Sequence, residues 1–500
     1  MTSLSADVAI VGSGICGLLV ARSLLHSGST VVMLERGALK THAEQLRDGV
    51  HAADVPGARH NHEIAPGTPG YEWDYEFAVG GTALHFEGQS ARFHTNDFRL
   101  RSEYGVGQDW PIGYRDLEPY YDEAERVMGV AGGPVGRDGK RASQPPHPLS
   151  PADRLIAPYL QPFGPLPSAR PSRPIGTRPA CCGSAVCGLC PVDARFTPLN
   201  GLQDVLRHPH LTLRQQTVAA RLRLSEDRRR VNAIECVATA DGKEVTVEAG
   251  RYVLCASGFE NPALLLRSGL DRPDTGRFLF DHKHTTMEVL LRRPAGAGMG
   301  ASLSTGASQA FRDGAFRSRR GSAFVVVNNP GIDLSEVLAQ ALKDGKTGKK
   351  ARAYAVDRWR RTLALDVCVE ELPLAERRVT LSPDKDSFGV PKVRVAYTGV
   401  SRYYEDAVQA IRKALATRLA PLGVVDVTAL PGPEGGHLLG TCRMGSGDTG
   451  VVDADQRHLD VENLWVAGGS SFPAYSSAHP TLTIAALAIR LSDHLATARV

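Results

Sequence analysis

The sequence predicts a mixed α/β fold that opens with a Rossmann-like β-α-β unit. Three observations in the first forty residues support this prediction. An apolar, β-branched run at 7–11 is typical of a buried parallel strand. The sequence GSGICG follows at 12–17, and residues 18–26 then repeat apolar side chains at helical spacing. A second strand is predicted over 30–34 and ends at Glu35.

Each part of this unit has a task in binding a dinucleotide. Gly12 allows the tight turn, Gly14 lets a pyrophosphate approach the backbone, and Gly17 lets helix and strand pack closely. The N-terminus of the helix directs unpaired N–H groups at the phosphates. Glu35 can accept hydrogen bonds from a ribose hydroxyl, and we count the adjacent Arg36 among the cofactor-binding residues. The motif alone fits FAD and NAD equally, and its place hundreds of residues before the last motif favours FAD.

Length and composition narrow the class of protein. The 500 residues predict roughly two or three domains, and 42% apolar with 22% charged residues is typical of a globular protein. A net charge of +4 is small for this length and does not favour nucleic-acid binding. The sequence has no apolar window of about 18 residues. Residues 1–6 lack a basic region and a cleavage site, so we expect a cytoplasmic protein without a membrane segment.

The far end of the chain carries the most specific motifs. Residues 436–490 contain GHLLGTCRMG, VVD, NLWVAGGS and SAHPTLTI in that order. These motifs resemble the glucose–methanol–choline (GMC) oxidoreductase family. Further segments agree with the family along most of the chain: VGGT at 79–82, RF at 92–93, DWPI at 109–112, LEPYYD at 117–122, CASG at 255–258, NPALLLRSG at 261–269, DH at 281–282 and RVTL at 378–381. Residues 290–365 have no counterpart that we can identify.

The resemblance implies two domains that are each discontinuous in sequence, as in the p-hydroxybenzoate hydroxylase-like architecture. A Rossmann-like FAD-binding domain would take residues 1–100, 195–290 and 435–500. A substrate-binding domain with an antiparallel sheet and loop-rich insertions would take residues 101–194 and 291–434. The resemblance also implies further cofactor contacts, at Gly80, Gly81, His85, Val218, Gly469, Ser470, Pro480 and Thr481.

Two histidines occupy the positions that carry catalysis in the family. His437 precedes the G-T-x-x-M stretch and His479 precedes P-T-x-T. The resemblance implies that they face the N5 position of the flavin, where an alcohol carbon gives up its hydride. Imidazole suits this reaction because a base with a pKa near neutrality can take the hydroxyl proton. We expect His437 to be the main base and His479 its partner, and the order can also be the reverse.

His85 matches a histidine that carries a covalent flavin bond in fungal pyranose oxidases. Related bacterial dehydrogenases keep a histidine at this position without the bond. We favour a non-covalent contact between His85 and FAD.

Four of the nine cysteines fall within ten residues: Cys181, Cys182, Cys187 and Cys190. This segment resembles the part of bacterial FAD glucose and fructose dehydrogenases that holds a [3Fe–4S] cluster, and closely spaced thiolates followed by proline suit such a site. Here two residues separate the last two cysteines, where those enzymes have three. Free structural thiols, or a disulfide in an exported protein, are the alternatives.

Two charged segments lack a place in these motifs. Glu370 and Glu371 precede a strand whose edge reaches the substrate in the family, so they are either substrate ligands for a hydroxyl or ammonium group or a surface pair. The basic run 343–361 has a helix-compatible sequence, and we interpret it as a solvated face or as a docking site for an acidic partner.

The main hypothesis is a flavoenzyme that oxidises an alcohol group of a small polar substrate to an aldehyde or ketone. The resemblance points to a sugar, an amino sugar or a glycoside, with oxygen, a quinone or a redox protein as possible electron acceptor. A second hypothesis is a lyase of the same family that uses the histidines for acid–base chemistry without net redox. A third is a flavoprotein subunit that only carries electrons.

Overall fold

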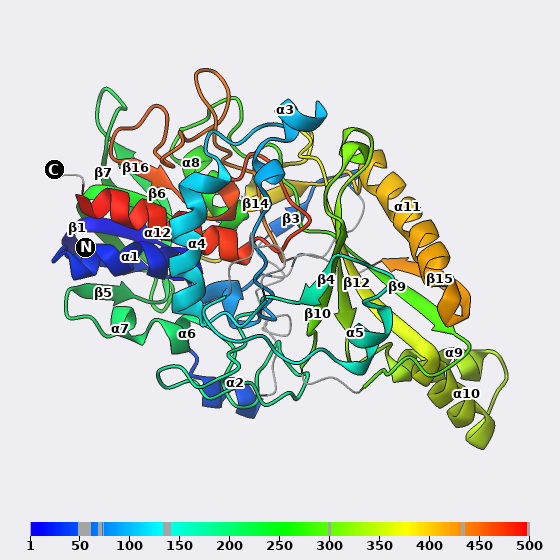
Figure 1. Cartoon of the computed structure of the whole chain (residues 1–500). Helices are drawn as coiled ribbons and strands as arrows, with labels where there is room; N and C mark the ends of the chain where they lie inside the picture. The colour runs from blue at the N-terminus through cyan, green and yellow to red at the C-terminus, as the bar shows by residue number, and fades with distance from the viewer. Residues whose placement is uncertain are drawn as a thin grey trace.

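The first strand, the glycine turn and the first helix form as the sequence predicts. The computed structural model describes residues 2–48, 62–68, 73, 75–133, 142–298, 302–431 and 436–497 (Figure 1). Strand β1 (Thr2–Val11) runs into the turn, α1 (Ile15–His26) follows it, and β2 (Val31–Leu34) returns parallel to β1. The buried halves of both strands consist of Val, Ile, Ala, Leu and Met, which fits a sheet that is covered on both faces.

A seven-stranded sheet gathers segments from three distant parts of the chain. Its order is β5-β2-β1-β8-β7-β6, and β16 pairs with β8. The strands around β1 are parallel, whereas β7 and β6 continue the sheet antiparallel. The added strands are β5 (Leu211–Arg214), β6 (Thr217–Leu224), β7 (Val231–Ala238), β8 (Glu244–Leu254) and β16 (Leu464–Val466). The predicted Rossmann-like sheet is thereby confirmed.

Three helices from both ends and the first third of the chain pack together on this sheet. The C-terminal α12 (Thr481–Thr497) packs against α1 and also against α4 (Tyr114–Met128) (Figure 1). Helix α8 (Ser257–Arg267) packs against β6. Because α12 begins inside the last predicted motif, two residues after His479, this packing brings His479 to the same end of the sheet as the glycine turn.

A second sheet of six strands is antiparallel throughout, as the resemblance implied. Its order is β15-β9-β12-β11-β10-β4, and α11 (Arg402–Arg418) covers one face with a separate apolar core. The strands are β4 (Phe163–Pro165), β9 (His284–Leu291), β10 (Gly306–Phe311), β11 (Ala323–Asn328), β12 (Thr362–Val369) and β15 (Val424–Pro431). We keep the two-domain division as a proposal with one correction: the boundary expected at 290 falls inside β9, which belongs wholly to this sheet.

A small third sheet joins the two regions. It pairs β13 (Arg378–Lys385), β14 (Pro391–Ala396) and β3 (His62–Ile64). The basic run 343–361 is helical as expected, in the projecting pair α9 (Leu334–Lys343) and α10 (Gly348–Arg361) (Figure 1). None of the described helices is both long and apolar enough to cross a membrane.

Short elements complete the described chain. The helices are α2 (His42–Asp48), α3 (Leu100–Tyr104), α5 (Pro151–Ile156), α6 (Pro198–Gly201) and α7 (Gln203–Leu206). The 3₁₀ turns are η3 (Gly81–Leu84), η4 (Thr95–Phe98), η5 (Ala315–Ser318), η6 (Ala420–Leu422) and η7 (Gly469–Ser471).

Candidate active site

The glycines of the first turn have distinct structural tasks. Gly12 has φ of +100°, and a Cβ atom there would lie 2.5 Å from the carbonyl oxygen of Cys255. A Cβ on Gly17 would lie 2.0 Å from the Gly12 carbonyl oxygen, so only glycine lets α1 approach the turn this closely. Gly14 differs, because the nearest atom to an added Cβ is the Gly80 carbonyl oxygen at 3.9 Å. A side chain at Gly14 would therefore enter open space at the N-terminus of α1.

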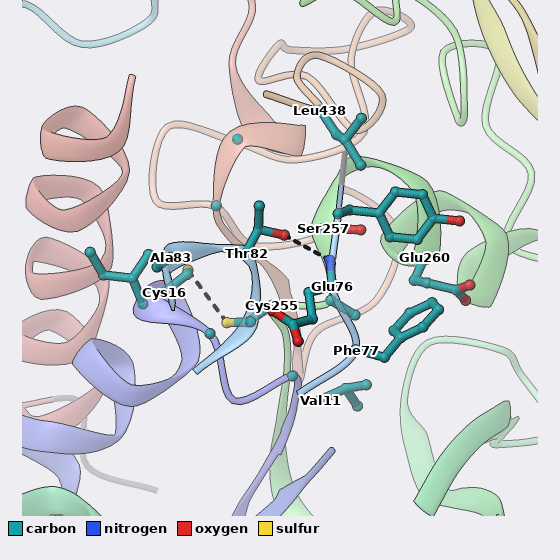
Figure 2. Close-up of a pocket in the computed structure, with 18 of the residues that line it drawn as sticks. Val11, Cys16, Glu76, Phe77, Thr82, Ala83, Cys255, Ser257, Glu260 and Leu438 are labelled. Carbon is teal, nitrogen blue, oxygen red and sulfur yellow. Dashed lines mark hydrogen bonds between the residues drawn. The ribbon is translucent and has the colours of Figure 1, made fainter. Parts of the chain in front are cut away.

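That space is a cavity at the carboxyl end of the parallel strands, which we call the glycine-turn cavity (Figure 2). Segments from the N-terminal, middle and C-terminal parts of the chain line it. Eight of the predicted cofactor-binding residues are among them: Gly12, Gly14, Glu35, Arg36, Gly81, Val218, Gly469 and Thr481. In Figure 2 the Glu76 N–H donates to the Thr82 hydroxyl, a 3.1 Å bond that joins two segments of the wall.

Five other predicted cofactor residues do not line this cavity. Gly17 and Gly80 pack against the glycine turn beside the cavity. Gly17 lies against the Gly12 backbone, and the Gly80 N–H donates to the Ser13 carbonyl oxygen at 3.0 Å. Ser470 is buried and its hydroxyl accepts from the Asn261 side chain at 2.9 Å. Pro480 is buried directly before α12. His85 lies on a second cavity, described below.

Glu35 is held rigidly at the end of β2. Its Oε2 accepts from the Ser13 hydroxyl at 2.7 Å and the Ser13 N–H at 3.1 Å, and its Oε1 accepts from the Gly37 N–H at 2.9 Å. Burial raises the pKa of Glu35, and these donors oppose the rise. Arg36 pairs with Asp386 at 2.9 Å and stacks over the Phe77 ring. Both side chains are thus fixed before any ligand arrives.

A second cavity adjoins the first, and five histidines line it. This histidine cavity has His282, His284, His437 and His479 on its wall, together with His85, Glu87, Ser304, Asn328 and Asp366. Five residues line both cavities: Thr82, Phe86, Gly436, His437 and Thr481. His437 is the one histidine among these five, so its side chain stands at the junction of the two cavities.

Four of these imidazoles, those of His282, His284, His437 and His479, form a continuous cluster. The His282 ring lies 5.2 Å from that of His437, 4.6 Å from that of His479 and 4.4 Å from that of His284, measured between centroids. The sequence motifs predicted a catalytic role for His437 and His479, whereas His282 and His284 were not predicted as site residues. The available signal was the spacing D-H-K-H at 281–284, which puts His282 and His284 on one face at the start of β9.

An acidic partner sets the charge of this cluster. His284 Nδ1 lies 2.8 Å from Asp366 Oδ1, and the attraction to Asp366 raises the pKa of His284 well above its ordinary value, against the opposing effect of burial. Burial, reinforced by the charge on His284, lowers the pKa of His437 to about 3. The pKa values of His282 and His479 are lowered for the same reasons. These shifts favour a charged His284 beside Asp366 and neutral imidazoles at His282, His437 and His479.

Glu370 and Glu371 require a correction, because they are neither a surface pair nor part of either cavity wall. Both are fully buried. Glu370 binds Arg317 through two hydrogen bonds of 3.0 and 3.1 Å. Glu371 accepts from the Ser401 N–H at 2.8 Å and pairs with Arg377 at 3.4 Å. The acids that line the histidine cavity are instead Glu87 and Asp366, which sequence reasoning did not single out.

His85 occupies the wall of the histidine cavity rather than the glycine-turn cavity. It follows η3, and its Nε2 lies 2.5 Å from Glu76 Oε2. Glu76 lines the glycine-turn cavity, so the pair spans the partition between the two.

The cysteine loop lies behind the histidine cavity. All nine cysteines are free thiols, so the structure contains no disulfide there. Cys181 and Cys187 approach the Ser302 hydroxyl at 3.8 and 3.9 Å, and Arg170 Nη1 lies 3.5 Å from Cys187 Sγ. Arg170 also donates to Ser304, a residue of the cavity wall. Cys187 and Cys190 are buried, Cys181 is half-buried and Cys182 is exposed.

Comparison with known proteins places this arrangement in a family. Residues 172–284 and 373–488 match the N- and C-terminal parts of the GMC oxidoreductase family. The chain is 31% identical to the fructose dehydrogenase large subunit of Gluconobacter japonicus, with 98% of each chain covered. It is 29% identical to 6'''-hydroxyparomomycin C oxidase of Streptomyces lividus, covering 98% of this chain and 91% of that protein. The crystal structure of pyridoxine 4-oxidase from Mesorbium loti has the same fold, with a TM-score of 0.66, 21% identity and coverage of 99% and 100%. The chain belongs to the GMC oxidoreductase family.

Proposed function

We propose that this protein is an FAD-dependent enzyme that oxidises an alcohol group of a sugar, an amino sugar or a glycoside to an aldehyde or ketone. One observation carries the proposal: His437 stands at the junction of the glycine-turn cavity and the histidine cavity. A neutral imidazole at that junction can contact both a cofactor in the first cavity and a substrate in the second.

The residues of the glycine-turn cavity fit FAD, the cofactor of GMC oxidoreductases. No side chain caps the N-terminus of α1, so its N–H groups are open to a pyrophosphate beside Gly14. Glu35 and Arg36 stand at the end of β2, where the ribose of a dinucleotide binds. When bound, FAD would supply the acceptor for the hydride, which carries both electrons away from the alcohol carbon.

The protein residues would handle the proton and the charge of the substrate oxygen. We assign His437 as the base that accepts the hydroxyl proton on a ring nitrogen because of its place at the junction of the two cavities. Burial lowers its pKa, which leaves the ring nitrogen free to accept a proton but makes His437 a weaker base than an exposed histidine. We assign His479 as the partner that holds the substrate oxygen, with the reverse order as the alternative. The imidazolium of His284, fixed by Asp366, favours an oxygen that carries negative charge as its proton leaves. The carbon then gives up its hydride, and a carbonyl group remains.

Anaerobic mixing of the holoenzyme with a panel of sugars and amino sugars tests this proposal. Loss of the yellow flavin absorbance with a substrate, together with a carbonyl product, is the expected result. A flavin that keeps its absorbance while the protein cleaves a hydroxynitrile would instead support the lyase alternative. An electron-carrying subunit would show neither reaction.

Two acids in the histidine cavity support an amino-bearing substrate. Glu87 and Asp366 both line it, and one relative in the comparison is an oxidase of a hydroxyparomomycin. Desolvation by the surrounding protein raises the pKa of Glu87, and repulsion from the charge of Asp366 raises it further. A substrate ammonium beside Glu87 would reverse the effect by favouring the carboxylate.

We expect Glu87→Gln to raise KM for an amino sugar by about 10–150-fold, because a charge-assisted hydrogen bond contributes roughly 1.5–3 kcal/mol. KM for the corresponding neutral sugar should change little. Steady-state kinetics with the two sugars measures the ratio, and Glu462→Gln, on the surface, is the matched control. An equal change in KM for both sugars would exclude the ammonium contact.

We also propose that Cys181, Cys187 and Cys190 hold a [3Fe–4S] cluster, with Cys182 outside it. Cys187 and Cys190 are buried and Cys181 is half-buried, and Arg170 Nη1 lies 3.5 Å from Cys187 Sγ, which supports sulfur ligands in this loop. Such a cluster would supply a one-electron path to a quinone or a redox protein in place of oxygen. Assays of iron and acid-labile sulfide in anaerobically purified protein should give about three irons per chain. Flavin without iron would leave these cysteines as structural thiols.

Gly14→Val should abolish FAD binding while the protein stays folded. The valine methyl groups would enter the space beside the N-terminus of α1, where no protein atom lies nearer than 3.9 Å to the Cβ position. Flavin absorbance and far-UV circular dichroism of the purified variant measure the two properties. Gly17→Ala is the contrasting control, because its Cβ collides with the Gly12 backbone and should destabilise the fold itself. A Gly14→Val protein with a full complement of FAD would contradict the assignment of this cavity.

A further inference from the structure

One wall of the histidine cavity brings together four metal-ligating groups. His284 begins β9 and His282 lies two residues before it. Cys368 lies in β12 opposite His284, and His479 precedes α12. One donor atom from each residue can be chosen so that all four lie within 4.8 Å of one another. Within the ranges that the structure describes, this is the one group of three or more His, Cys, Asp or Glu residues that is so compact.

Two contacts within this group have the lengths of edges of a tetrahedral zinc site. His284 Nε2 lies 3.1 Å from His282 Nδ1, and Cys368 Sγ lies 3.6 Å from His479 Nε2. Zn–N bonds of about 2.0–2.1 Å and a Zn–S bond of about 2.3 Å give tetrahedron edges of roughly 3.3 Å between nitrogens and roughly 3.6 Å between nitrogen and sulfur. The two observed contacts share no atom, so they correspond to opposite edges of one tetrahedron.

The surroundings of the four groups suit a bound ion. Asp366 Oδ1 holds His284 Nδ1 at 2.8 Å, which directs His284 Nε2 toward the other donors. Carboxylates orient metal-binding histidines in this way. His282 and Cys368 are fully buried, and His479 is 6% exposed. The donor atoms His282 Nδ1 and His479 Nε2 each face another member of the group. Three nitrogens and one sulfur favour zinc over the hard ions magnesium and calcium.

We propose that His282, His284, Cys368 and His479 bind one Zn²⁺ ion at the wall of the histidine cavity. Binding requires the thiol proton of Cys368 and the proton held by His284 to leave for solvent. The ion would occupy part of the cavity and engage His479, so zinc and substrate would exclude each other. Zinc binding itself does not depend on the proposed oxidation, because the donors are present whatever the substrate.

Equilibrium dialysis of the holoenzyme against Zn²⁺, followed by elemental analysis, tests the site without any turnover. We expect Cys368→Ser to remove one zinc ion per chain relative to the unaltered protein. Asp366→Asn should lower the affinity for that ion by about 10–100-fold, the usual effect of removing a carboxylate that orients a ligand. Cys236→Ser is the matched control, since Cys236 is a buried thiol in β7 that lines neither cavity.

Cobalt provides a second readout that reports the ligand geometry. Co²⁺ bound by the holoenzyme should give the intense visible d–d bands of a four-coordinate ion, at wavelengths beyond the flavin bands, and Cys368→Ser should lose them. The cysteine loop is a competing source of thiolate, so Cys187→Ser should keep the bands. Flavin content verifies that each variant is folded, and His284→Gln replaces Cys368→Ser if the latter loses its flavin. The proposal would be overturned if the folded Cys368 or His284 variant bound as much zinc as the unaltered protein. It would also be overturned if the cobalt bands depended on Cys187 alone.

Discussion

Replacement of His437 by alanine should lower the rate of flavin reduction by about 10²–10⁴-fold, the usual contribution of a positioned base. The imidazole stands where the two cavities meet, and its removal leaves the substrate hydroxyl without a group to take its proton. The variant should keep its FAD, because the glycine turn and Glu35 are untouched. Anaerobic rapid mixing with excess substrate gives the rate directly from the loss of flavin absorbance.

A second histidine provides the matched control. His458 is also buried, with 2% exposure, and burial lowers its pKa to about 4, yet it lines neither cavity. His458→Ala should leave the rate of flavin reduction in the folded protein within a few fold of the original, because a histidine outside both cavities cannot take the substrate proton. Unchanged reduction in His437→Ala would remove the base assignment. A larger loss in His479→Ala than in His437→Ala would reverse the order of the two residues.

Much of the fold was predictable because local patterns and global architecture agree in this chain. The strand, turn and helix at 7–26 require glycine at positions where a side chain would collide with backbone, and this requirement is visible in the sequence as a motif. Gly17 illustrates this, because a single methyl group there would meet backbone 2.0 Å away. The boundary near 290 was misplaced because β9 has the same apolar alternation whichever sheet it joins, and only its pairing with β12 and β15 decides the matter.

The site was predictable only where a motif encodes it. His437 and His479 sit in motifs, whereas the roles of His284 and Asp366 arise from the pairing of β9 with β12, which brings together residues 82 positions apart. Glu370 and Glu371 were misjudged for a related reason. A sequence shows two adjacent charges, and surface exposure is the ordinary expectation for such a pair. Their buried arginine partners come from positions that no local pattern connects to them, 317 and 377.

The corrected position of Glu370 leads to the second large effect. Glu370→Gln should lower the free energy of unfolding by about 3–5 kcal/mol, because removing one partner of a buried ion pair leaves the other charge poorly compensated. Arg317 is fully buried and would keep its 2.9 Å ion pair with Asp97 and its stacking on the Tyr104 ring, but it would lose the charge of Glu370. The Ser322 N–H, which now donates to Glu370 at 2.9 Å, would also face a weaker acceptor. Chemical denaturation of the holoenzyme, followed by circular dichroism, measures the loss.

Asp406→Ala separates this effect from the loss of any acidic side chain. Asp406 pairs with Arg402 on the exposed face of α11, where side chains that are 53% and 90% exposed make an ion pair worth about 1 kcal/mol or less. The ion pairs of Arg317 with Asp97 and Glu370 join η4, η5 and the end of β12. If they are structural, the two variants should differ greatly in stability, and neither should change the preference among substrates. If Glu370→Gln were as stable as Asp406→Ala but discriminated differently between neutral and amino sugars, Glu370 would belong to substrate binding after all. The buried pairing with Arg317 argues for the first outcome, because a carboxylate that already satisfies a guanidinium and a backbone N–H has little capacity left for a ligand.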